Sequence, residues 1–157
     1  MANKKIELKT ATLHDLEPIK SMYCDFFACH AELQPLYYKK SDSGDYPSNI
    51  IKSETADIII ASEAGNIVGF VHVSEEKTPP YDSLVQYCYA VCVDLFVLPL
   101  HRKNGIGTML IGAAKDWAKR RGFAYIELNA LANNGEAVRL YEKEGFNTVQ
   151  KVMRFTL

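Results

Sequence analysis

The hydrophobic positions of the chain follow two different periods. Apolar residues at every second position, as at Ile6 and Leu8, predict short strands, and a long run rich in β-branched and aromatic residues predicts a buried central strand. Ala64-Gly65-Asn66 supplies turn residues for a hairpin between two of the strands. The predicted strands span residues 6–10, 58–61, 67–73, 84–98, 125–131 and 146–155.

Apolar residues spaced by three or four positions predict helices between these strands. Thr12 can cap the first helix, whose apolar stripe runs from Leu16 to Phe26 or Phe27. Three further helices are predicted over residues 49–53, 107–121 and 136–144, and connections over 41–47 and 75–82. Hairpins mixed with strand–helix–strand crossovers indicate one mixed α/β (α+β) sheet.

Length and charge narrow the class of protein. With 157 residues, 48% of them hydrophobic, we expect a single domain over 1–157. The 18 basic and 19 acidic residues leave no excess charge to attract a phosphate backbone, so no nucleic-acid partner is expected. The longest apolar run, 87–93, is far below the ~20 residues of a membrane span, and the N-terminus has no signal-peptide core. We therefore expect a soluble, cytoplasmic protein without a membrane partner.

Cys24, Cys29, Cys88 and Cys92 form no C-x-x-C pair, and no histidine cluster has zinc-finger spacing. We expect no metal site, and we interpret all four cysteines as reduced packing residues. The even spacing of Cys88 and Cys92 predicts that both lie on one face of a strand.

The segment 93–108 contains the first candidate site. A buried strand ends there, and after a short loop Gly105 and Gly107 open a helix. The free N–H groups of a helix N-terminus attract phosphate, and Arg102 and Lys103 add positive charge, so the segment predicts a diphosphate cradle. An ATP-type loop is excluded because Ala113 stands where lysine is required, and Leu110 replaces the third glycine of the dinucleotide motif. The alternative is a tight turn that permits helix–strand packing.

What remains is R-x-x-G-x-G, from Arg102 to Gly107, directly after a strand. This pattern resembles the acetyl-CoA motif of the GCN5-related N-acetyltransferase (GNAT) superfamily. Residues 134–146 resemble the second signature of that family, N-x-x-A-x-x-x-Y-x-K-x-G-F. The two motifs have the usual order and separation, and the resemblance covers essentially the whole chain.

The resemblance implies a mostly antiparallel central sheet of about six to seven strands, with helices on both faces and a splay between the fourth and fifth strands. It also implies acetyl-CoA as cosubstrate, with its pyrophosphate on the N–H groups of 103–108. The N–H of Val97 or of a near neighbour would stabilise the oxyanion, and the Tyr141 hydroxyl would protonate the leaving thiolate. The alternative is that Tyr141 is an aromatic residue of the hydrophobic core. The implied cofactor-binding residues are Leu95, Phe96, Val97, Arg102, Lys103, Asn104, Gly105, Ile106, Gly107, Thr108, Asn134 and Tyr141.

Asp94 is the candidate base, because it is an acid in an otherwise apolar strand close to the expected oxyanion position. The alternative is a hydrogen-bonded or edge-exposed acid. Some relatives carry two consecutive acids at this point of the strand, whereas in this chain Val93 takes the place of the first acid. A chain of water molecules ending at Glu127, Asp94 or His72 would serve equally well to accept the proton of the amine.

The resemblance implies an N-acetyltransferase that acts by direct attack of a primary amine from a small molecule or peptide. Aromatic faces and carboxylates in 23–46 would suit a cationic acceptor, although we expect half of the six rings to be core. The six rings are those of Tyr23, Phe26, Phe27, Tyr37, Tyr38 and Tyr46, and the carboxylates are those of Asp25, Glu32, Asp42 and Asp45. The alternatives are a non-catalytic acyl-CoA-binding regulatory module and a structural dimerisation domain. The sequence does not fix the oligomeric state, and a homodimer is one option because relatives often dimerise and an exposed sheet edge invites pairing.

Overall fold

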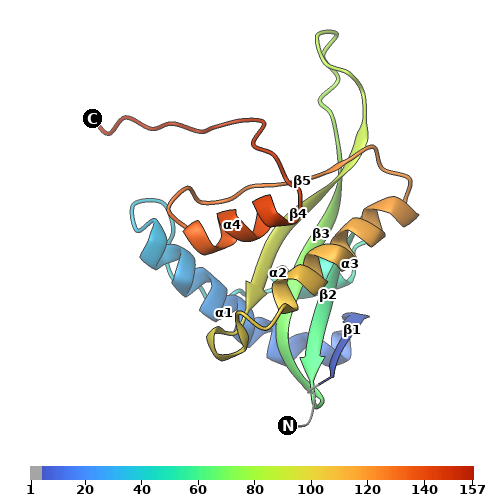
Figure 1. Cartoon of the computed structure of the whole chain (residues 1–157), viewed down its shortest axis with the longest axis vertical. Coiled ribbons are helices and arrows are strands. Elements are labelled where there is room, and N and C mark those ends of the chain that lie inside the picture. The colour runs from blue at the N-terminus through green and yellow to red at the C-terminus, as the bar shows by residue number, and fades with distance from the viewer. Residues whose placement is uncertain (1–4) are drawn as a thin grey trace.

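The structure, a computed structural model, describes residues 5–157, and its centre is a five-stranded sheet (Figure 1). The strands lie in the order β1-β2-β3-β4-β5, with antiparallel neighbours except for the parallel pair of β4 and β5. Their bounds are β1 Ile6–Thr10, β2 Ala56–Glu63, β3 Asn66–Lys77, β4 Cys88–Val97 and β5 Ile126–Leu128. The predicted mixed, mostly antiparallel sheet is confirmed, but with fewer strands than the six or seven expected.

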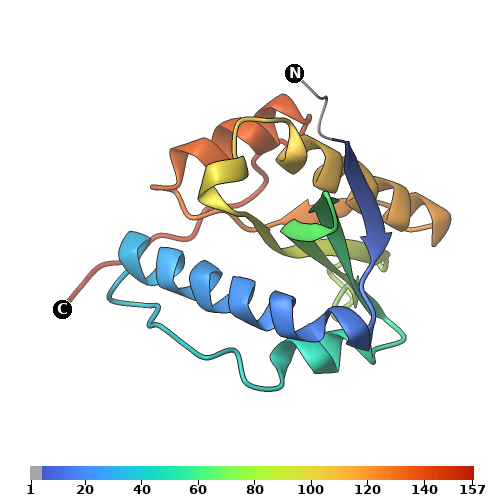
Figure 2. The same cartoon turned by 90° about the horizontal axis from the view of Figure 1, so that it is seen from below.

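Helices cover both faces of this sheet, as predicted. Helices α1 and α2 lie on one face and α3 on the other (Figure 2). The helices are α1 Leu16–Leu33, α2 Tyr46–Ile51, α3 Ile106–Arg120 and α4 Gly135–Lys143, with short 3₁₀ turns at Leu13–Asp15 and Pro99–His101. The helix predicted over 49–53 begins three residues earlier, since Pro47 suits the first turn of a helix.

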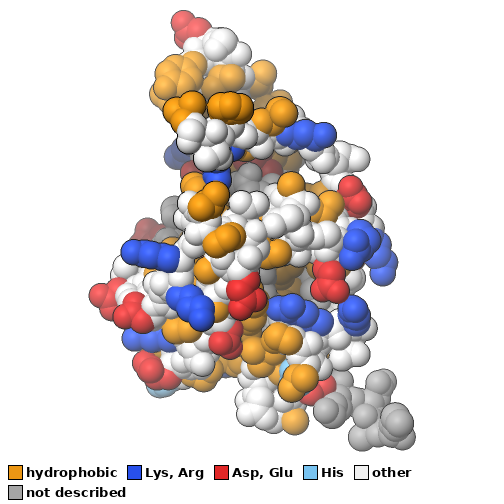
Figure 3. Space-filling view, turned by 90° about the vertical axis from the view of Figure 1, so that its left-hand side faces the viewer, with side chains coloured by type: hydrophobic (Ala, Val, Ile, Leu, Met, Phe, Trp, Pro, Cys, Tyr) orange, Lys and Arg blue, Asp and Glu red, His pale blue; other side chains and the backbone are white. Residues whose placement is uncertain are grey.

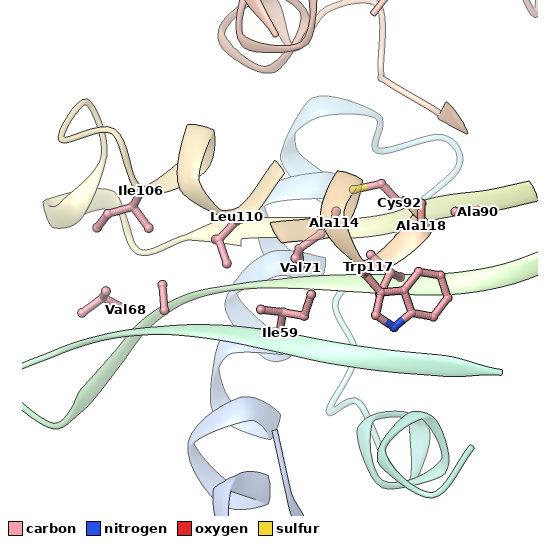
Figure 4. Close-up of a cluster of buried hydrophobic side chains, with 12 residues drawn as sticks. Ile59, Val68, Val71, Ala90, Cys92, Ile106, Leu110, Ala114, Trp117 and Ala118 are labelled. Carbon is pink, nitrogen blue, oxygen red and sulfur yellow. The ribbon is translucent and has the colours of Figure 1, made fainter. Parts of the chain in front are cut away.

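The face beneath α3 holds one hydrophobic core. Leu110, Ala114 and Trp117 of α3 lie against Ile59 and Val71 of the sheet (Figure 4). At the end of this core the Trp117 indole N–H donates to Asp57 Oδ2 at 2.7 Å, and the Arg121 guanidinium lies 4.3 Å from the indole ring.

A second core lies beneath α1 and α2 and is richer in aromatic rings. Tyr23 and Phe26 of α1 pack on Phe70 of β3, with the rings of Tyr23 and Phe70 4.5 Å apart. The sequence predicts that half of the six rings of 23–46 lie in the core: Tyr23 and Phe26 are buried there, and Phe27 is partly buried against it.

The β3–β4 hairpin turns later in the chain than predicted. Residues 75–77, expected in a connection, continue β3, and β4 begins at Cys88 rather than at residue 84. A backbone hydrogen bond from Thr78 to Tyr87 closes the ladder, and residues 78–87 project from the body (Figure 1). The hydrophobic side chains of this tip gather at the upper end of Figure 3.

The strand predicted over 146–155 is absent. Beyond Phe146 the chain runs away from the sheet (Figure 1), and Val149, Val152 and Met153 are almost fully exposed. Alternating apolar residues create a preference for a strand, but a strand needs a neighbour that completes its hydrogen bonds. Among residues 5–157 no element supplies that neighbour.

The short β5 creates the splay between the fourth and fifth strands. It pairs only with Ala90, Val91 and Cys92, so residues 94–97 of β4 have no β5 partner within the described chain.

No helix in residues 5–157 is long and apolar enough to cross a membrane.

Candidate active site

A β-bulge at Val93 determines which way the side chains of β4 point. Cys92 pairs with Val73 and Asp94 with His72, so Val93 is an extra residue on β4. Ala90 and Cys92 belong to the core beneath α3, whereas Phe96 belongs to the core beneath α1. The bulge thus reverses the alternation and turns Asp94 toward α1 and α2.

Asp94 lies at the centre of a cluster built from four elements. Its Oδ2 accepts hydrogen bonds from the hydroxyls of Tyr23 on α1 (3.1 Å) and Tyr46 at the start of α2 (3.0 Å). The same oxygen lies 3.2 Å from Nδ1 of His72 on β3. The side chains of His72 and Asp94 are only 7% and 12% exposed. Burial and the Asp94 charge raise the pKa of both tyrosines, which therefore remain hydrogen-bond donors at neutral pH.

The two oxygens of the Asp94 carboxylate have different surroundings. Oδ2 receives all of these contacts, so the alternative of a hydrogen-bonded acid describes this oxygen well. Within residues 5–157 no side chain donates to Oδ1. Asp94 is therefore held firmly through one oxygen and keeps the lone pairs of the other for a ligand.

Tyr141 of α4 lies close enough to Cys92 and Asp94 for both residues to influence the pKa of its hydroxyl. Burial, followed by the effects of Cys92 and Asp94, raises the pKa of the Tyr141 hydroxyl well above its ordinary value. Burial and Asp94 likewise raise the pKa of the Cys92 thiol to about 12. Both groups keep their protons at neutral pH, and no hydrogen bond joins the Tyr141 hydroxyl to any described residue. Tyr141 can therefore act as a proton donor.

Contacts at both ends place α4 between α3 and α1. Near its C-terminal end, Lys115 of α3 donates to the backbone carbonyl of Glu144. Gly107 allows a close approach of α3 and α4, because a Cβ there would lie 2.9 Å from Cδ2 of Leu140. Before α4, the Asn133 side chain donates to the carbonyl of Leu33 at the end of α1 (2.6 Å).

The predicted cradle is a loop that opens α3. Gly105 is the N-cap residue with φ +80°, a left-handed conformation that favours glycine, and no side chain caps the first turn. The N–H groups at this end are thus available to an anion. Lys103 is also left-handed, and its Nζ lies 3.4 Å from Glu136.

Arg102 points back toward β4 rather than into this loop. Its Nε donates to the carbonyl of Val97 at 2.9 Å, and its guanidinium carbon lies 5.5 Å from the centre of the Phe96 ring. The Leu98 N–H donates to Val68 of β3 (2.9 Å). Because alternate N–H groups of a strand point to opposite edges, the N–H of Val97 points toward the edge from which β5 has diverged.

Other predicted residues have local partners. Asn134 is the N-cap of α4, and its Oδ1 accepts from the N–H of Ala137 (3.3 Å). Glu127 lies beside Tyr89, whose pKa it helps to raise, and no contact in residues 5–157 joins it to Asp94. His101 lies 3.4 Å from Glu63. The structure thus brings Asp94 and His72 together but places Glu127 elsewhere.

Two features of the site are missing from the sequence reasoning. The sequence suggests Tyr23 and Tyr46 as acceptor contacts or core rings, whereas the structure shows them as donors to Asp94. The bulge has no sequence signal either, because Val93 is apolar like most residues of this strand. An acid inside a strand and two tyrosines that need partners for their hydroxyls are the only available hints.

Neither of two surface hollows contains a predicted site residue. One, of 260 Å³, lies between β1 and α3, and the other, of 460 Å³, lies at the β3–β4 hairpin. Residues 5–157 contain no group of three His, Cys, Asp or Glu side chains that could share a metal ion.

Comparison with known proteins defines the class. The model of the acetyltransferase (GNAT) family matches residues 19–146, so the chain belongs to that family and is an acetyltransferase. It is 34% identical over 147 residues to aminoglycoside N(6')-acetyltransferase type 1 of Acinetobacter haemolyticus, covering 93% of this chain and 92% of that protein. It is 27% identical over 140 residues to the uncharacterized N-acetyltransferase YhfO of Bacillus subtilis, covering 89% and 87%.

Solved structures share the fold at low sequence identity. A point mutant of the BH1408 protein from Bacillus halodurans superimposes with a TM-score of 0.89 at 20% identity, covering 96% of this chain and 99% of that one. The aminoglycoside N-acetyltransferase AAC(6')-Iy in complex with CoA gives 0.81 at 16% identity, covering 99% and 96%. These likenesses support the predicted fold.

Proposed function

We propose that the protein transfers the acetyl group of acetyl-CoA to a primary amine of a small cationic molecule. The observation that carries this proposal is the position of Tyr141. Its protonated hydroxyl lies near the Asp94 carboxylate, one oxygen of which accepts no hydrogen bond from a described side chain. Asp94 belongs to β4, the strand that leads to the uncapped N-terminus of α3. An acid, a base and an anion site thus lie along one path.

The cradle fits the diphosphate of the cosubstrate, which supplies an activated acetyl thioester when it is bound. The N–H groups of 103–108 would hold the diphosphate, and Lys103 would exchange its ion pair with Glu136 for a phosphate oxygen. Arg102 would act chiefly by holding β4 and the cradle together, since its Nε already donates to Val97.

Three groups of this chain would share the chemical step, and two tyrosines would hold one of them in place. Val97 would donate its N–H to the carbonyl oxygen as negative charge develops there. The amine nitrogen forms its bond to the carbonyl carbon while the carbon–sulfur bond breaks. Tyr141 would give its proton to the departing sulfur. Asp94 would take the surplus proton of the amine on Oδ1, with Tyr23 and Tyr46 holding Oδ2 in place.

A cationic small molecule is the acceptor that the surroundings of Asp94 favour. The carboxylate would attract an ammonium group before its deprotonation, and Tyr46 and Tyr37 offer exposed aromatic faces on the same side of the sheet. Relatives that are named aminoglycoside acetyltransferases support the same class of acceptor.

The test is CoA-thiol release from acetyl-CoA with a panel of amines. An aminoglycoside and a polyamine should react at least about tenfold faster than a neutral-tailed amine or a peptide N-terminus, since only they carry further positive charge near the acceptor nitrogen. Equal rates across the panel would contradict the acceptor class. Calorimetric binding of CoA without thiol release from any amine would favour the non-catalytic binding module instead.

A further inference from the structure

The proposed reaction must remove two protons from the acceptor nitrogen. An ammonium group carries three protons on its nitrogen, and the amide that forms from it keeps one. Oδ1 of Asp94 can take one of the two protons that leave. Tyr141 takes neither, because its hydroxyl already carries the proton that goes to the sulfur. The reaction therefore calls for a second proton acceptor beside Asp94.

His72 of β3 lies in the position that such an acceptor would need. It is the register partner of Asp94 on the neighbouring antiparallel strand, and register partners point to the same face of a sheet. Nδ1 of His72 lies 3.2 Å from Oδ2 of Asp94, and the histidine side chain is only 7% exposed. The two side chains thus form a contact pair on the face of the sheet where α1 and α2 lie.

The hydrogen-bond network assigns the proton of the His72 ring to Nδ1. Oδ2 of the Asp94 carboxylate offers only lone pairs, so a lone pair on Nδ1 at 3.2 Å would be repelled. Tyr46 donates its hydroxyl proton to the same Oδ2, so its oxygen, 3.3 Å from Nδ1, also faces the ring as an acceptor. A neutral imidazole with its proton on Nδ1 has its lone pair on Nε2.

Nε2 of His72 is the unused end of this ring. Both contacts of the ring go through Nδ1, and Nε2 has no hydrogen-bond partner within residues 5–157. Among the described side chains, the only nitrogen or oxygen that is both buried and without a partner is Oγ of Ser43. Nε2 therefore reaches open space although most of the ring is buried. Nε2 and Oδ1 of Asp94 are thus the two atoms of the contact pair that remain free to accept a proton.

The surroundings of the His72 ring suit a positive charge. Tyr23 of α1 and Tyr46 of α2 direct their hydroxyls to the carboxylate beside the ring, and the register partner from β2 is the apolar Ile58. The next titratable residue on the same face of β3 is Glu76. Within residues 5–157 the ring has no hydrogen bond or ion pair with a lysine or arginine. A protonated ring would therefore face carboxylates and hydroxyls and no cation.

We propose that Nε2 of His72 takes the first proton of the ammonium group, and that Oδ1 of Asp94 takes the second as the carbon–nitrogen bond forms. This inference rests on the proposed function. An aspartate that accepts the Nδ1–H of a histidine is the arrangement by which catalytic triads orient Nε2 as a base. Imidazole is also better matched to this task than a carboxylate, because its ordinary pKa of about 6.5 lies closer to that of an amine.

The proton balance of the reaction closes with these two acceptors. The first transfer leaves a neutral amine and an imidazolium beside the Asp94 carboxylate. When the nitrogen bonds to the carbonyl carbon, its remaining protons become far more acidic, and the carboxylate is then a strong enough base. Tyr141 gives its proton to the sulfur as the carbon–sulfur bond breaks. Of the two protons held by the pair, one returns through water to Tyr141 and the other is released to the solvent.

Nitrogen-15 NMR of the imidazole rings tests the proton assignment and needs no activity. The chain has four histidines, and the ring signals of His72 are identified through its own backbone signals. At pH 8 we expect Nδ1 to give the signal of a protonated ring nitrogen and Nε2 that of an unprotonated one. A proton on Nε2 at this pH would overturn the proposal, because it would leave no lone pair for the ammonium group.

The variant His72→Asn separates the two ends of the ring. The amide nitrogen of asparagine can take the place of Nδ1 and donate to Asp94, but asparagine has no atom at the place of Nε2. With an aminoglycoside or a polyamine as acceptor, we expect kcat/KM at pH 7 to fall about 10²-fold or more, as on the loss of a general base. The matched control is His14→Asn, which changes an exposed histidine in the first 3₁₀ turn and should leave kcat/KM unchanged.

The pH profile distinguishes a proton acceptor from a structural residue. The free form of an amine with a pKa of about 10.4 becomes about tenfold more abundant with each pH unit above neutrality. The loss in His72→Asn should therefore shrink by up to about tenfold per pH unit between pH 7 and 9. An equal loss at every pH, or no loss in an active chain, would overturn this proposal alone. A parent chain that acetylates no amine would contradict the proposed function, and this inference with it.

Discussion

At the scale of single residues, the site depends on groups that keep or release protons because of where they lie. Tyr141 is kept protonated by burial and by the neighbouring Cys92 and Asp94. A phenol with a raised pKa keeps its proton at neutral pH, so it cannot serve as a base there and is available to donate to the leaving sulfur. The environment of Tyr141 therefore favours the acid role and not the role of a base.

Replacing Tyr141 by phenylalanine removes this proton donor while keeping the ring. We expect turnover to fall about 10²–10⁴-fold, the usual range for general-acid catalysis, with little change in the affinity for acetyl-CoA. Steady-state CoA release and calorimetry measure the two effects. The matched control is Tyr125→Phe, which changes an exposed hydroxyl and should leave turnover unchanged. Unchanged turnover in Tyr141→Phe would remove Tyr141 from the mechanism.

The two glycines Gly105 and Gly112 of the cradle helix predict opposite effects of alanine. At Gly105, with φ +80°, alanine is strained by about 1–2 kcal/mol and would disturb the N–H groups of the first turn. At Gly112, inside α3, a Cβ meets nothing within 4 Å, so alanine should stabilise by about 0.5–1 kcal/mol. Thermal unfolding and CoA titration check both, and only Gly105→Ala should weaken CoA binding. Equal CoA affinity in the two variants would argue against the cradle.

At the scale of elements, the regular parts of the fold can be predicted and the irregular ones cannot. Gly105 and Gly122 bracket α3, whose predicted ends lie within one residue of the observed ones. The bulge at Val93 could not be predicted because it changes the direction of the side chains and not their polarity. Tyr23 and Tyr46 could not be predicted as the hydrogen-bond donors to Asp94 because they lie 71 and 48 residues away in sequence. The predicted last strand fails because pairing depends on a neighbour and not on local preference.

The bulge leads to a prediction for Asp94. Asp94→Asn keeps the shape of the side chain but removes the charge that attracts an ammonium group and accepts its proton. We expect kcat/KM to fall about 10²-fold or more at neutral pH, and less when the pH approaches the pKa of the amine, where the free amine is already abundant. Asp82→Asn, which changes an exposed acid in the tip of the β3–β4 hairpin, serves as control. A loss that is equal at all pH values would assign Asp94 a structural role.

At the scale of the whole molecule, two cores on opposite faces of the sheet hold β4 in place, and each contains groups that must stay neutral. Cys92 lies in the core beneath α3, and Tyr23 in the core beneath α1. Burial raises the pKa of both groups, so the folded state binds their protons more tightly than the unfolded state does. Their contribution to stability is complete below the unfolded pKa values and is lost as pH rises toward the folded ones.

The protein should therefore lose stability in alkali from about pH 9 upward, where unfolded cysteine begins to ionise. Cys92 contributes a slope of up to about 1.4 kcal/mol per pH unit until its folded pKa of about 12. Urea unfolding at intervals from pH 7 to 11 measures this, and Cys92→Ala should be less stable at pH 7 but lose stability less steeply. The same alkaline slope in Cys92→Ala and in the parent chain would contradict the expectation.

A crystal structure with bound coenzyme A is the measurement that addresses the central claim most directly. The account predicts that the diphosphate oxygens accept hydrogen bonds from the N–H groups of 103–108, and that the sulfur lies within hydrogen-bond distance of the Tyr141 hydroxyl. Ligand density at any other surface, or a sulfur that lies far from Tyr141, would contradict it.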